Sequence, residues 1–356
     1  VLLISEALAV VRRLFEAQVL PPPAVENVLV YSLDPKDPIF ESFREDYLGF
    51  DEWLKKCSAD HRRAWVIWQE GKIAAFSIYK SEDGSEIGLN GKTLKLCSFK
   101  VDNQFRGMAF GELILRSAYS YAKANSYSWL YLTAFAEKQE FLLSFLDELG
   151  FEQLPEKNKN GEVIMVKPAG WRSSLPDTED ATEFLRRYGP FSFKQHDVNA
   201  FVVPIQPDYH RYLFPDAEDQ SDFLPGRLCF GNSLRKAYLC NASIRSISPG
   251  DILFFYRSGG QSTIEVVGVV EDLLLTNDAA AIAAFVGKRT VYTYEEIEVL
   301  SRRREVLSVL FMTVRADGAR VGMPELVAHR VVNAPPQSIQ SVSKEACQWL
   351  LNRLQL

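Results

Sequence analysis

Hydrophobic residues follow two spacings along this chain, one typical of strands and one typical of helices. In residues 25–168, short runs rich in Val, Ile and aromatic side chains predict strands, and apolar residues three or four positions apart predict helices. The expected strands are 27–33, 64–69, 72–80, 94–101, 129–135, 151–155 and 162–168. The expected helices are 37–47, 50–57, 108–124 and 138–150. Strands and helices therefore mix throughout this half of the chain.

The second half of the chain is richer in strands. Apolar runs predict strands at 191–195, 199–205, 251–258, 263–273 and 306–314. Short helices are expected at 181–189, 233–240, 281–288 and 343–354. This mixture is typical of a barrel-like sheet with short helices. We therefore predict an α+β protein, with a mixed sheet flanked by helices followed by a small β-barrel with short helices.

Breaks in these patterns suggest the domain limits. The three prolines at 21–23 end a predicted helix over residues 1–20, and a polar stretch at 171–180 interrupts the pattern again. A length of 356 residues also favours two domains. We expect a helical extension at 1–24, a first domain at 25–168, a linker with a short helix at 169–189, and a second domain at 190–356.

Composition narrows the class of protein. A formal net charge of -6 argues against a general polyanion binder, although a local basic patch is compatible with it. The 5 cysteines are scattered without a CxxC pair and the 4 histidines lie far apart, so we expect neither a disulfide framework nor a metal site. This cysteine pattern favours a reducing, cytoplasmic compartment. We also expect no membrane span and no signal peptide. The start at Val1 rather than Met leads us to expect residues upstream.

A polar turn between the strand at 94–101 and the helix at 108–124 is the first candidate site. Its small residues allow backbone N–H groups to approach a ligand closely, at a helix N-terminus that favours anions. Arg106 adds a forked cation suited to phosphate oxygens. Taken alone, the turn is equally well explained as a tight strand-to-helix connection.

The surrounding residues favour the ligand site. Residues 106–111 read Arg-Gly-Met-Ala-Phe-Gly and resemble the acetyl-CoA motif (R/Q)-x-x-(G/A)-x-(G/A) of the GNAT superfamily of N-acetyltransferases. The segment FLDELGF at 145–151 resembles the helix-to-hairpin sequence of that family. The resemblance covers about 25–168 in the family's element order, and it implies an N-acetyltransferase with acetyl-CoA as co-substrate.

The resemblance also implies where acetyl-CoA would bind. Pantetheine would pair with the main chain of Phe99, Lys100 and Val101, beside a splayed partner strand at 129–135. Gln139 replaces a family asparagine as a hydrogen-bond donor. The residues expected to hold the pyrophosphate are Arg106, Gly107, Met108, Ala109, Phe110 and Gly111.

Catalytic residues are harder to identify, because the chain departs from the family pattern. Leu146 stands where many members have a tyrosine that protonates the thiolate, and residues 91–101 contain no carboxylate to act as a base. Water or one of three side chains, Glu137, Cys97 and Tyr79, would have to contribute. The strand carries Lys92, Lys95 and Lys100 instead, which either suit an acidic or phosphate-bearing partner or merely alternate along an edge.

A second resemblance covers about 190–335. Residues 231–258, with a short helix, a Pro-Gly-Asp turn and a strand that ends in Tyr-Arg-Ser, resemble the EVE and ASCH branches of the PUA-like superfamily. Such domains hold nucleic acid, often a modified base, through aromatic faces, polar edges and cations. Residues 171–356 hold 20 basic and 22 acidic side chains, so RNA contact would be local. The candidates are Tyr209, His210, Arg211, Arg235, Lys236, Tyr238, Tyr256, Arg257 and Ser258.

Each of these candidates has a simpler reading as a core aromatic or a solvated side chain. The same holds for the basic run at 301–305, which on a helix is usually a solvated face. We therefore carry two main hypotheses. One is an acetyl-CoA-dependent N-acetyltransferase with a PUA-like module that binds RNA or a ribonucleoprotein. The other is a weakly active or inactive GNAT-fold protein that serves as an RNA-binding or regulatory module, with the regulatory half of a larger polypeptide as a third reading.

Overall fold

The computed structural model describes residues 24–169, 180–217, 229–241, 243–260, 262–315 and 319–356. The chain divides into two compact units, Val1–Ser173 and Ser174–Leu356, which are described separately below. The predicted helix at 1–20 lies outside the described residues, and so does nearly all of the predicted polar break at 171–180.

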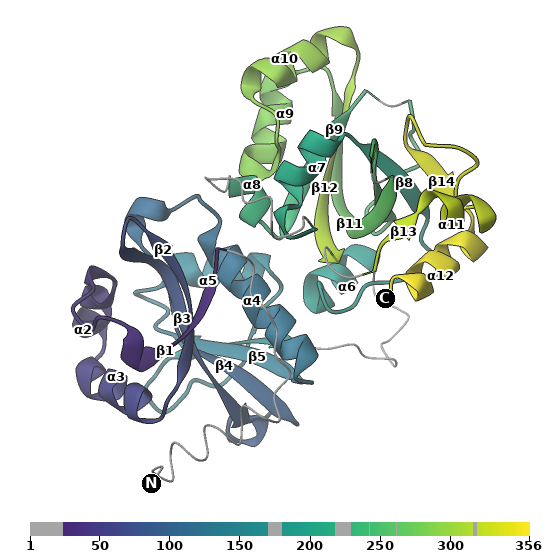
Figure 1. Ribbon diagram of the computed structural model, residues 1–356. Coiled ribbons are helices and arrows are strands. Elements are labelled where there is room, and N and C mark those ends of the chain that lie inside the picture. The colour runs from purple at the N-terminus through teal and green to yellow at the C-terminus, as the bar shows by residue number, and fades with distance from the viewer. Residues whose placement is uncertain (1–23, 170–179, 218–228, 242, 261, 316–318) are drawn as a thin grey trace. The chain divides into compact units, whose positions relative to one another are not determined.

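The first unit is built on a mixed sheet of seven strands in the order β1-β2-β3-β4-β5-β7-β6 (Figure 1). Only β4 and β5 pair in parallel, and every other neighbouring pair is antiparallel. The strands are β1 (Glu26–Leu29), β2 (Arg63–Gln69), β3 (Lys72–Asp83), β4 (Lys92–Val101), β5 (Trp129–Ala134), β6 (Glu152–Gln153) and β7 (Val163–Pro168). The predicted strands of the first half are confirmed, with shifted ends.

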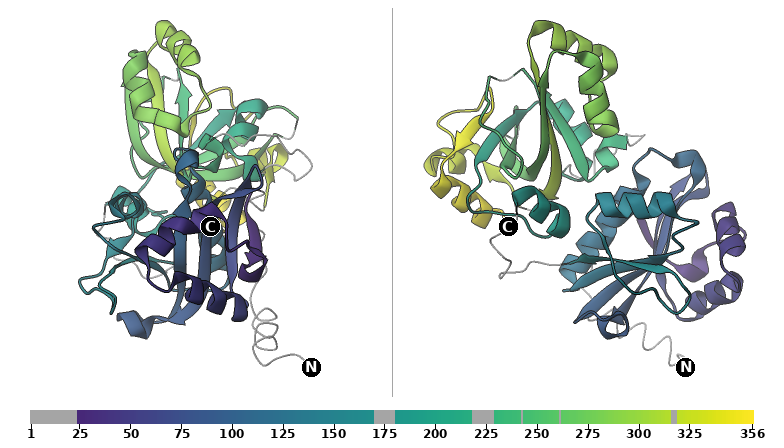
Figure 2. Two further views of the ribbon diagram at one scale, coloured as in Figure 1. Left: turned by 90° about the vertical axis from the view of Figure 1, so that its left-hand side faces the viewer. Right: turned by 180° about the vertical axis from the view of Figure 1, so that it is seen from behind.

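Helices cover both faces of this sheet (Figures 1 and 2). The helices are α2 (Glu41–Asp46), α3 (Phe50–Ala59), α4 (Phe110–Ala124) and α5 (Glu140–Glu148). Phe43 of α2 and Phe50 of α3 pack in one cluster with Phe76 of β3, while α4 contacts the opposite face, where Tyr121 meets Trp65 of β2. Alternate residues of β2 and β3 thus serve different cores, as strand geometry requires.

A tight hairpin joins β2 to β3 at Glu70 and Gly71. Both residues have positive φ, 51° and 76°. Two consecutive left-handed residues make the mirror-image turn that matches the twist of paired strands, and glycine adopts this conformation without a steric penalty. The strands predicted on either side of this turn, at 64–69 and 72–80, are confirmed as β2 and β3.

The second unit contains another seven-stranded mixed sheet, in the order β14-β8-β10-β11-β12-β9, with β13 paired to β11. Among the described strands of this sheet, only β8 and β10 run parallel. The strands are β8 (Ala200–Ile205), β9 (Arg235–Cys240), β10 (Ile252–Arg257), β11 (Thr263–Thr276), β12 (Val306–Arg315), β13 (Val321–Gly322) and β14 (Gln340–Val342). Two bulges interrupt the long β11–β12 ladder. Such bulges bend a strand and increase its twist.

Short helices pack on both faces of this second sheet (Figure 2). They are α6 (Ala181–Tyr188), α7 (Pro207–Leu213), α8 (Cys229–Asn232), α9 (Ala279–Val286), α10 (Tyr294–Arg303), α11 (Met323–Ala328) and α12 (Lys344–Arg353). One core joins Leu350 of α12 to Phe254 of β10, and the other joins Leu213 of α7 to Phe255 of the same strand. Neighbouring residues of β10 therefore point into separate cores.

Three expectations for the second half need correction. Residues 233–240 are predicted as a helix, but Arg235 to Cys240 form strand β9. Pairing with β12 decides their structure here and overrides the local preference. Residues 191–195, predicted as a strand, form none. The α+β class is confirmed, but no pairing joins β14 to β9 among the described residues, so the sheet does not close into the predicted barrel.

Gly268 in β11 provides a test of the second core. A Cβ atom there would lie 2.5 Å from Cδ2 of the fully buried Phe311. We expect Gly268→Ala to lower the free energy of unfolding by about 1–3 kcal/mol, because the ring must move in a close-packed interior. Urea denaturation of the full chain measures the loss.

The matched control is Gly260→Ala, since a Cβ at Gly260 would meet no heavy atom within 4 Å. It should change stability by less than about 0.5 kcal/mol. Equal stability of the two variants would contradict this account of the packing around Phe311.

Candidate active site

Strands β4 and β5 pair for only three residues and then separate. The ladder joins Thr93 to Trp129, Leu94 to Leu130 and Lys95 to Tyr131. Among the described residues, no pairing between the two strands continues beyond Lys95, although β4 runs on to Val101 and β5 to Ala134. The facing edges of both strands are therefore open, and an extended ligand could pair with them as an added strand does.

A β-bulge lies at the start of this open segment. Opposite β4, Ile78 pairs with Ser98 and Tyr79 pairs with Leu96, so Cys97 is the extra residue. A bulge bends its strand and redirects the neighbouring side chains. Here it turns β4 away from β5 at the point where the parallel ladder ends.

The turn that follows β4 carries the predicted phosphate motif. Gly107 has φ +81° and Ala109, the residue before α4, has φ +55°. A non-glycine residue in the left-handed region is strained, and such residues concentrate at ligand-binding turns. The guanidinium of Arg106 lies 5.5 Å from the centre of the Phe141 ring, at the start of α5. The first turn of α4 leaves backbone N–H groups without intrahelical acceptors, as every helix does.

Close packing also shapes the inside of this turn. A Cβ on Gly111 would lie 3.2 Å from Cζ of Phe145 and 3.6 Å from Cζ of Phe99. Phe99 and Phe145 stack with ring centres 6.2 Å apart. The glycine thus lets α4, α5 and β4 approach one another behind the open edges. The residues present fit an elongated ligand with an anionic group at the turn and a neutral arm between the strands.

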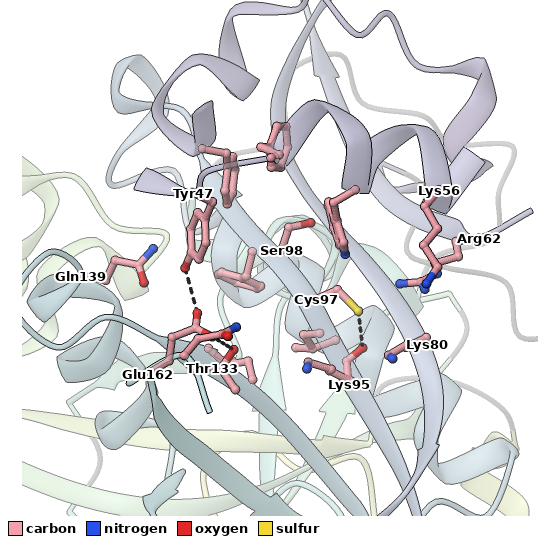
Figure 3. Close-up of a pocket in the computed structure, with 18 of the residues that line it drawn as sticks. Tyr47, Lys56, Arg62, Lys80, Lys95, Cys97, Ser98, Thr133, Gln139 and Glu162 are labelled. Carbon is pink, nitrogen blue, oxygen red and sulfur yellow. Dashed lines mark hydrogen bonds between the residues drawn. The ribbon is translucent and has the colours of Figure 1, made fainter. Parts of the chain in front are cut away.

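A pocket of about 400 Å³ opens beside the separated strands (Figure 3). Aromatic residues of the α2 and α3 region form one wall, β4 and β5 form another, and the segment before β7 completes it. The polar and charged side chains that line the pocket are Tyr47, Lys56, Arg62, Lys80, Lys95, Ser98, Thr133, Gln139, Asn160 and Glu162.

One end of the pocket holds a buried carboxylate (Figure 3). Glu162, next to the start of β7, is 5% exposed. Its Oε1 accepts a hydrogen bond from Tyr47 Oη at 3.1 Å, and its Oε2 accepts from Thr133 Oγ1 at 3.2 Å and Asn158 Nδ2 at 2.6 Å. Among the described residues no cation forms an ion pair with Glu162, so the side chains that donate hydrogen bonds to this buried carboxyl group are all neutral.

Tyr47 remains a proton donor in this setting. Burial of the phenol, and then the negative charge of Glu162, raise the pKa of Tyr47 well above its usual value. A buried carboxylate on a pocket wall, held by neutral donors and not by a cation, is an arrangement that favours binding of a positively charged group.

The other end of the pocket is cationic (Figure 3). Lys80 on β3 and Lys95 on β4 are directly opposite in the antiparallel ladder. Arg62, at the end of the turn after α3, and Lys56 on α3 also line this end. Lys80 forms an ion pair with Glu82, and Arg62 pairs with Asp60 at 3.1 Å. The pocket therefore has one negative end and one positive end.

The three catalytic candidates named from the sequence lie in different places. Cys97 lines the pocket, but burial raises its pKa, so it stays a neutral thiol. Tyr79 packs against Trp65 at 3.8 Å between ring centres and exchanges hydrogen bonds with Asn27, outside the pocket lining. Glu137 is exposed and outside the pocket lining too. Leu146 is fully buried.

The residues expected to contact acetyl-CoA lie along the open edges. Phe99 and Gln139 line the pocket, and Gln139 Oε1 accepts a hydrogen bond from the backbone N–H of Phe135 at 3.0 Å. Lys100 and Val101 continue the open edge of β4, with the Lys100 ammonium bonded to Ser42. Arg106 to Gly111 form the turn and the start of α4. Their roles toward the cofactor stay predictions.

Sequence reasoning missed the polar residues that the pocket brings together, above all Tyr47, Arg62 and Glu162. They come from three segments that lie far apart in the sequence, and no motif links them. The one available signal was Glu162 itself, a carboxylate at the edge of an otherwise apolar strand segment. The short predicted helix at 37–47 gave no reason to single out its last residue.

A second pocket, of about 430 Å³, lies in the second unit. Of the nucleic-acid candidates, Tyr209, Tyr238 and Ser258 line it. Tyr209 packs on Tyr292 at 5.0 Å between ring centres, and Tyr238 Oη donates to the Pro204 carbonyl at 3.0 Å. Burial raises the pKa of both Tyr238 and Tyr292, so both phenols stay neutral. No charged side chain lines this pocket among the described residues.

The other candidates of that group are placed differently. His210, Lys236 and Tyr256 are buried, at 0%, 2% and 1% exposure, and their predicted contacts with nucleic acid stay predictions. These side chains serve the interior of the unit, and Lys236 Nζ donates to the Gly231 carbonyl. The remaining arginines do not line the pocket: Arg211 pairs with Asp208 and Arg235 with Glu271, while Arg257 ends β10.

Two further searches concern metals and membranes. The described part of the chain contains no group of three or more His, Cys, Asp and Glu side chains arranged to hold a metal ion. Within the same residues, none of the helices combines the length and the apolar character needed to cross a bilayer.

Comparison with solved structures finds weak likenesses. ASCH from Zymomonas mobilis is 12% identical with a TM-score of 0.33, covering 43% of this chain and 94% of that one. The IAA acetyltransferase from Bacillus cereus is 15% identical with a TM-score of 0.30, covering 40% and 97%. PaiA N-acetyltransferase from Thermoplasma acidophilum, in complex with coenzyme A, is 12% identical with a TM-score of 0.31, covering 40% and 98%. Likenesses this low assign no function.

Comparison of sequences gives a firmer result for the first unit. Among curated proteins, no sequence matches this chain. Residues 28–151 match the family model of the acetyltransferase (GNAT) family. The matched range runs from within β1 to the residue before β6, and includes the separated strands, the glycine turn and most of the pocket wall. Acetyl-CoA is the acyl donor of that family. Residues 28–151 of this chain therefore form an acetyltransferase domain of the GNAT family.

Proposed function

We propose that this protein transfers an acetyl group from acetyl-CoA to a primary amine bound in the pocket of the first unit. The observation that carries the proposal is the combination of the GNAT family match with strands β4 and β5 that open beside a polar pocket. The open strand edges would hold the pantetheine arm, and the turn from Arg106 to Gly111 would hold the pyrophosphate. Phe99 and Gln139 would bring the thioester to the pocket.

Glu162 is the group best placed to handle the proton of the amine. An acceptor enters as an ammonium ion, which the buried carboxylate attracts and then deprotonates. The free amine attacks the acetyl carbonyl, the new N–C bond forms, and the C–S bond breaks. The second proton leaves the nitrogen and ends on the departing thiolate. Tyr47, kept protonated by its raised pKa, positions the carboxylate through its hydrogen bond.

This assignment explains why the family's tyrosine is dispensable here. Leu146 is buried and cannot donate a proton. In its place, proximity and orientation of the two reactants supply much of the barrier reduction, and Glu162 supplies the base. The alternative of an inactive scaffold is less well supported, because the pocket retains a buried carboxylate that forms no ion pair among the described residues.

For the second unit, we propose a domain over residues 190–356 that binds single-stranded RNA and directs the acetyltransferase domain, residues 25–168, to its substrate. The pocket lined by Tyr209, Tyr238 and Ser258 supports this proposal, since neutral aromatic and polar walls suit a nucleobase. The balance of 20 basic and 22 acidic side chains in residues 171–356 favours contact at one base over general attraction to phosphates. The free cysteines support a reducing, cytoplasmic setting.

Arg106→Glu tests the cofactor site. The change removes a charge-assisted contact to phosphate and replaces it with repulsion, so we expect acetyl-CoA to bind at least 100-fold more weakly, on the order of 3 kcal/mol. Isothermal titration calorimetry on the full chain measures the binding. Lys123→Glu, the same charge change near the far end of α4 at an exposed residue, should leave the affinity unchanged. Unchanged binding by Arg106→Glu would refute the assignment.

Glu162→Gln tests the base. The amide keeps the shape and loses the ability to take a proton, so kcat should fall by roughly 10²–10⁴-fold while acetyl-CoA binding persists. Release of the CoA thiol with the best acceptor from a panel of primary amines gives the rate. Glu137→Gln is the control, because Glu137 is exposed and does not line the pocket. If kcat fell in Glu137→Gln and stayed unchanged in Glu162→Gln, the assignment of Glu162 as the base would be wrong.

Tyr209→Leu tests the second pocket. Loss of a stacking face costs about 1–3 kcal/mol per base, which corresponds to roughly 5- to 150-fold weaker binding of single-stranded RNA. Fluorescence anisotropy with a labelled RNA of mixed sequence measures it. Tyr212→Leu on the same helix is the matched control, since Tyr212 is exposed and lies outside the pocket lining. If the unaltered chain fails to bind RNA, the proposed role of this unit is wrong.

A further inference from the structure

The cationic end of the first pocket contains two lysines that face each other across paired strands, an arrangement that is unfavourable unless something compensates the charge. Lys80 and Lys95 are directly opposite in the β3–β4 ladder, and both line the pocket. Like charges opposite one another across two strands are destabilising. The pair therefore implies that an anion from outside the protein neutralises the positive charge that the protein's own carboxylates leave over.

Neighbouring carboxylates neutralise only part of this charge. Glu82 pairs with Lys80, and Asp60 pairs with Arg62. Among the described residues, Lys56 and Lys95 form no ion pair, although the Lys95 ammonium lies 5.2 Å from the centre of the Tyr131 ring. Four cations thus face two carboxylates.

The thiol between the lysines does not restore the balance. Cys97 lies among Lys80, Lys95 and Arg62, whose positive charges favour its ionised form. Burial has the larger effect and raises the pKa of Cys97, so the thiol carries no charge at neutral pH. An anionic ligand is the remaining source of compensation.

The opposite end of the same pocket carries the complementary charge. Glu162 is buried and held by neutral donors, and Figure 3 shows it with Tyr47 and Thr133, away from the group formed by Lys56, Arg62, Lys80 and Lys95. A molecule with an amine and an anionic group would match both ends at once. Its amine would face Glu162, where the proton must be removed, and its anion would face the cations.

We propose that the acceptor is a small amine that also carries a carboxylate or a phosphate, and that Lys56, Arg62, Lys80 and Lys95 bind this anionic group. The inference rests on the acetyltransferase function proposed above and names the substrate class of that site. A cavity of about 400 Å³ suits a small molecule. Anchoring the anion fixes the orientation of the amine, so the same contacts that select the acceptor also position it for attack.

The experiment compares matched acceptors with the full chain at saturating acetyl-CoA, with release of the CoA thiol as the signal. One arm uses ω-amino carboxylates from glycine to 5-aminovalerate, and another uses O-phosphoethanolamine. The third uses neutral and dicationic amines of the same lengths, namely amino alcohols and diamines. We expect at least one anionic acceptor to exceed its matched neutral amine at least 10-fold in kcat/KM, and the better of the first two arms identifies the anion as carboxylate or phosphate.

A variant tests the binding role of the cations. Lys95→Gln should raise KM for the anionic acceptor about 10-fold and lower kcat, while the KM for acetyl-CoA stays nearly constant. Because the change removes a like-charge contact with Lys80, the melting temperature in the absence of acceptor should be unchanged or higher. A merely structural lysine would instead lower it. Lys72→Gln, at the exposed start of the same β3 strand, is the matched control and should alter neither quantity.

The outcomes separate this inference from the function on which it rests. If calorimetry shows no binding of acetyl-CoA, the acetyltransferase function itself fails. If acetyl-CoA binds but neutral amines or diamines react at least as well as anionic ones, or if no member of the panel reacts, the proposed acceptor class is overturned. Loss of stability in Lys95→Gln without a change in KM would also overturn it.

Discussion

The separation of β4 from β5 is the constraint on which the rest of the first unit depends. A parallel ladder of three residue pairs fixes the two strands at one end, and the bulge at Cys97 turns β4 aside immediately afterwards. Gln139 accepts a hydrogen bond from Phe135 just beyond the end of β5, and the stacked Phe99 and Phe145 fill the space toward α4. Backbone N–H and C=O groups that would pair in a continuous sheet remain available to a ligand. The pocket opens beside these unpaired strand edges.

Two features of the pocket lower the stability of the unliganded protein and would favour binding of a ligand. Glu162 is buried without an ion-pair partner among the described residues, and Lys80 faces Lys95 across a ladder. Both arrangements cost free energy in the unliganded protein. Both would be relieved by one ligand that brings a positive group to the first and a negative group to the second. Strained or unbalanced electrostatics of this kind concentrate at functional sites because binding compensates them.

The second unit follows a different logic, since its pocket is neutral. Its sheet is packed on both faces, and neighbouring aromatic residues of β10 enter separate cores. The ring of Phe311 packs so closely on β11 at Gly268 that a larger residue there would clash with it. Tyr209, Tyr238 and Tyr292 then face a cavity that carries no formal charge in its described lining. Recognition there would depend on shape and stacking, whereas the acceptor proposed for the first unit would be recognised by opposite charges.

Local patterns in the sequence determined most of the first unit, including its strands, its helices and the glycine-containing turn at Arg106 to Gly111. Alternation, helical spacing and glycine turns act over a few residues, so they can be recognised without the fold. Strand β9 was mistaken for a helix because its state depends on pairing with β12, some seventy residues away. The two polar ends of the pocket likewise depend on contacts between segments that lie far apart in the sequence. Tyr47, Arg62, Lys80, Lys95 and Glu162 meet only because β3, β4 and β7 share one sheet and the α2–α3 segment covers it, and no short-range signal encodes that meeting.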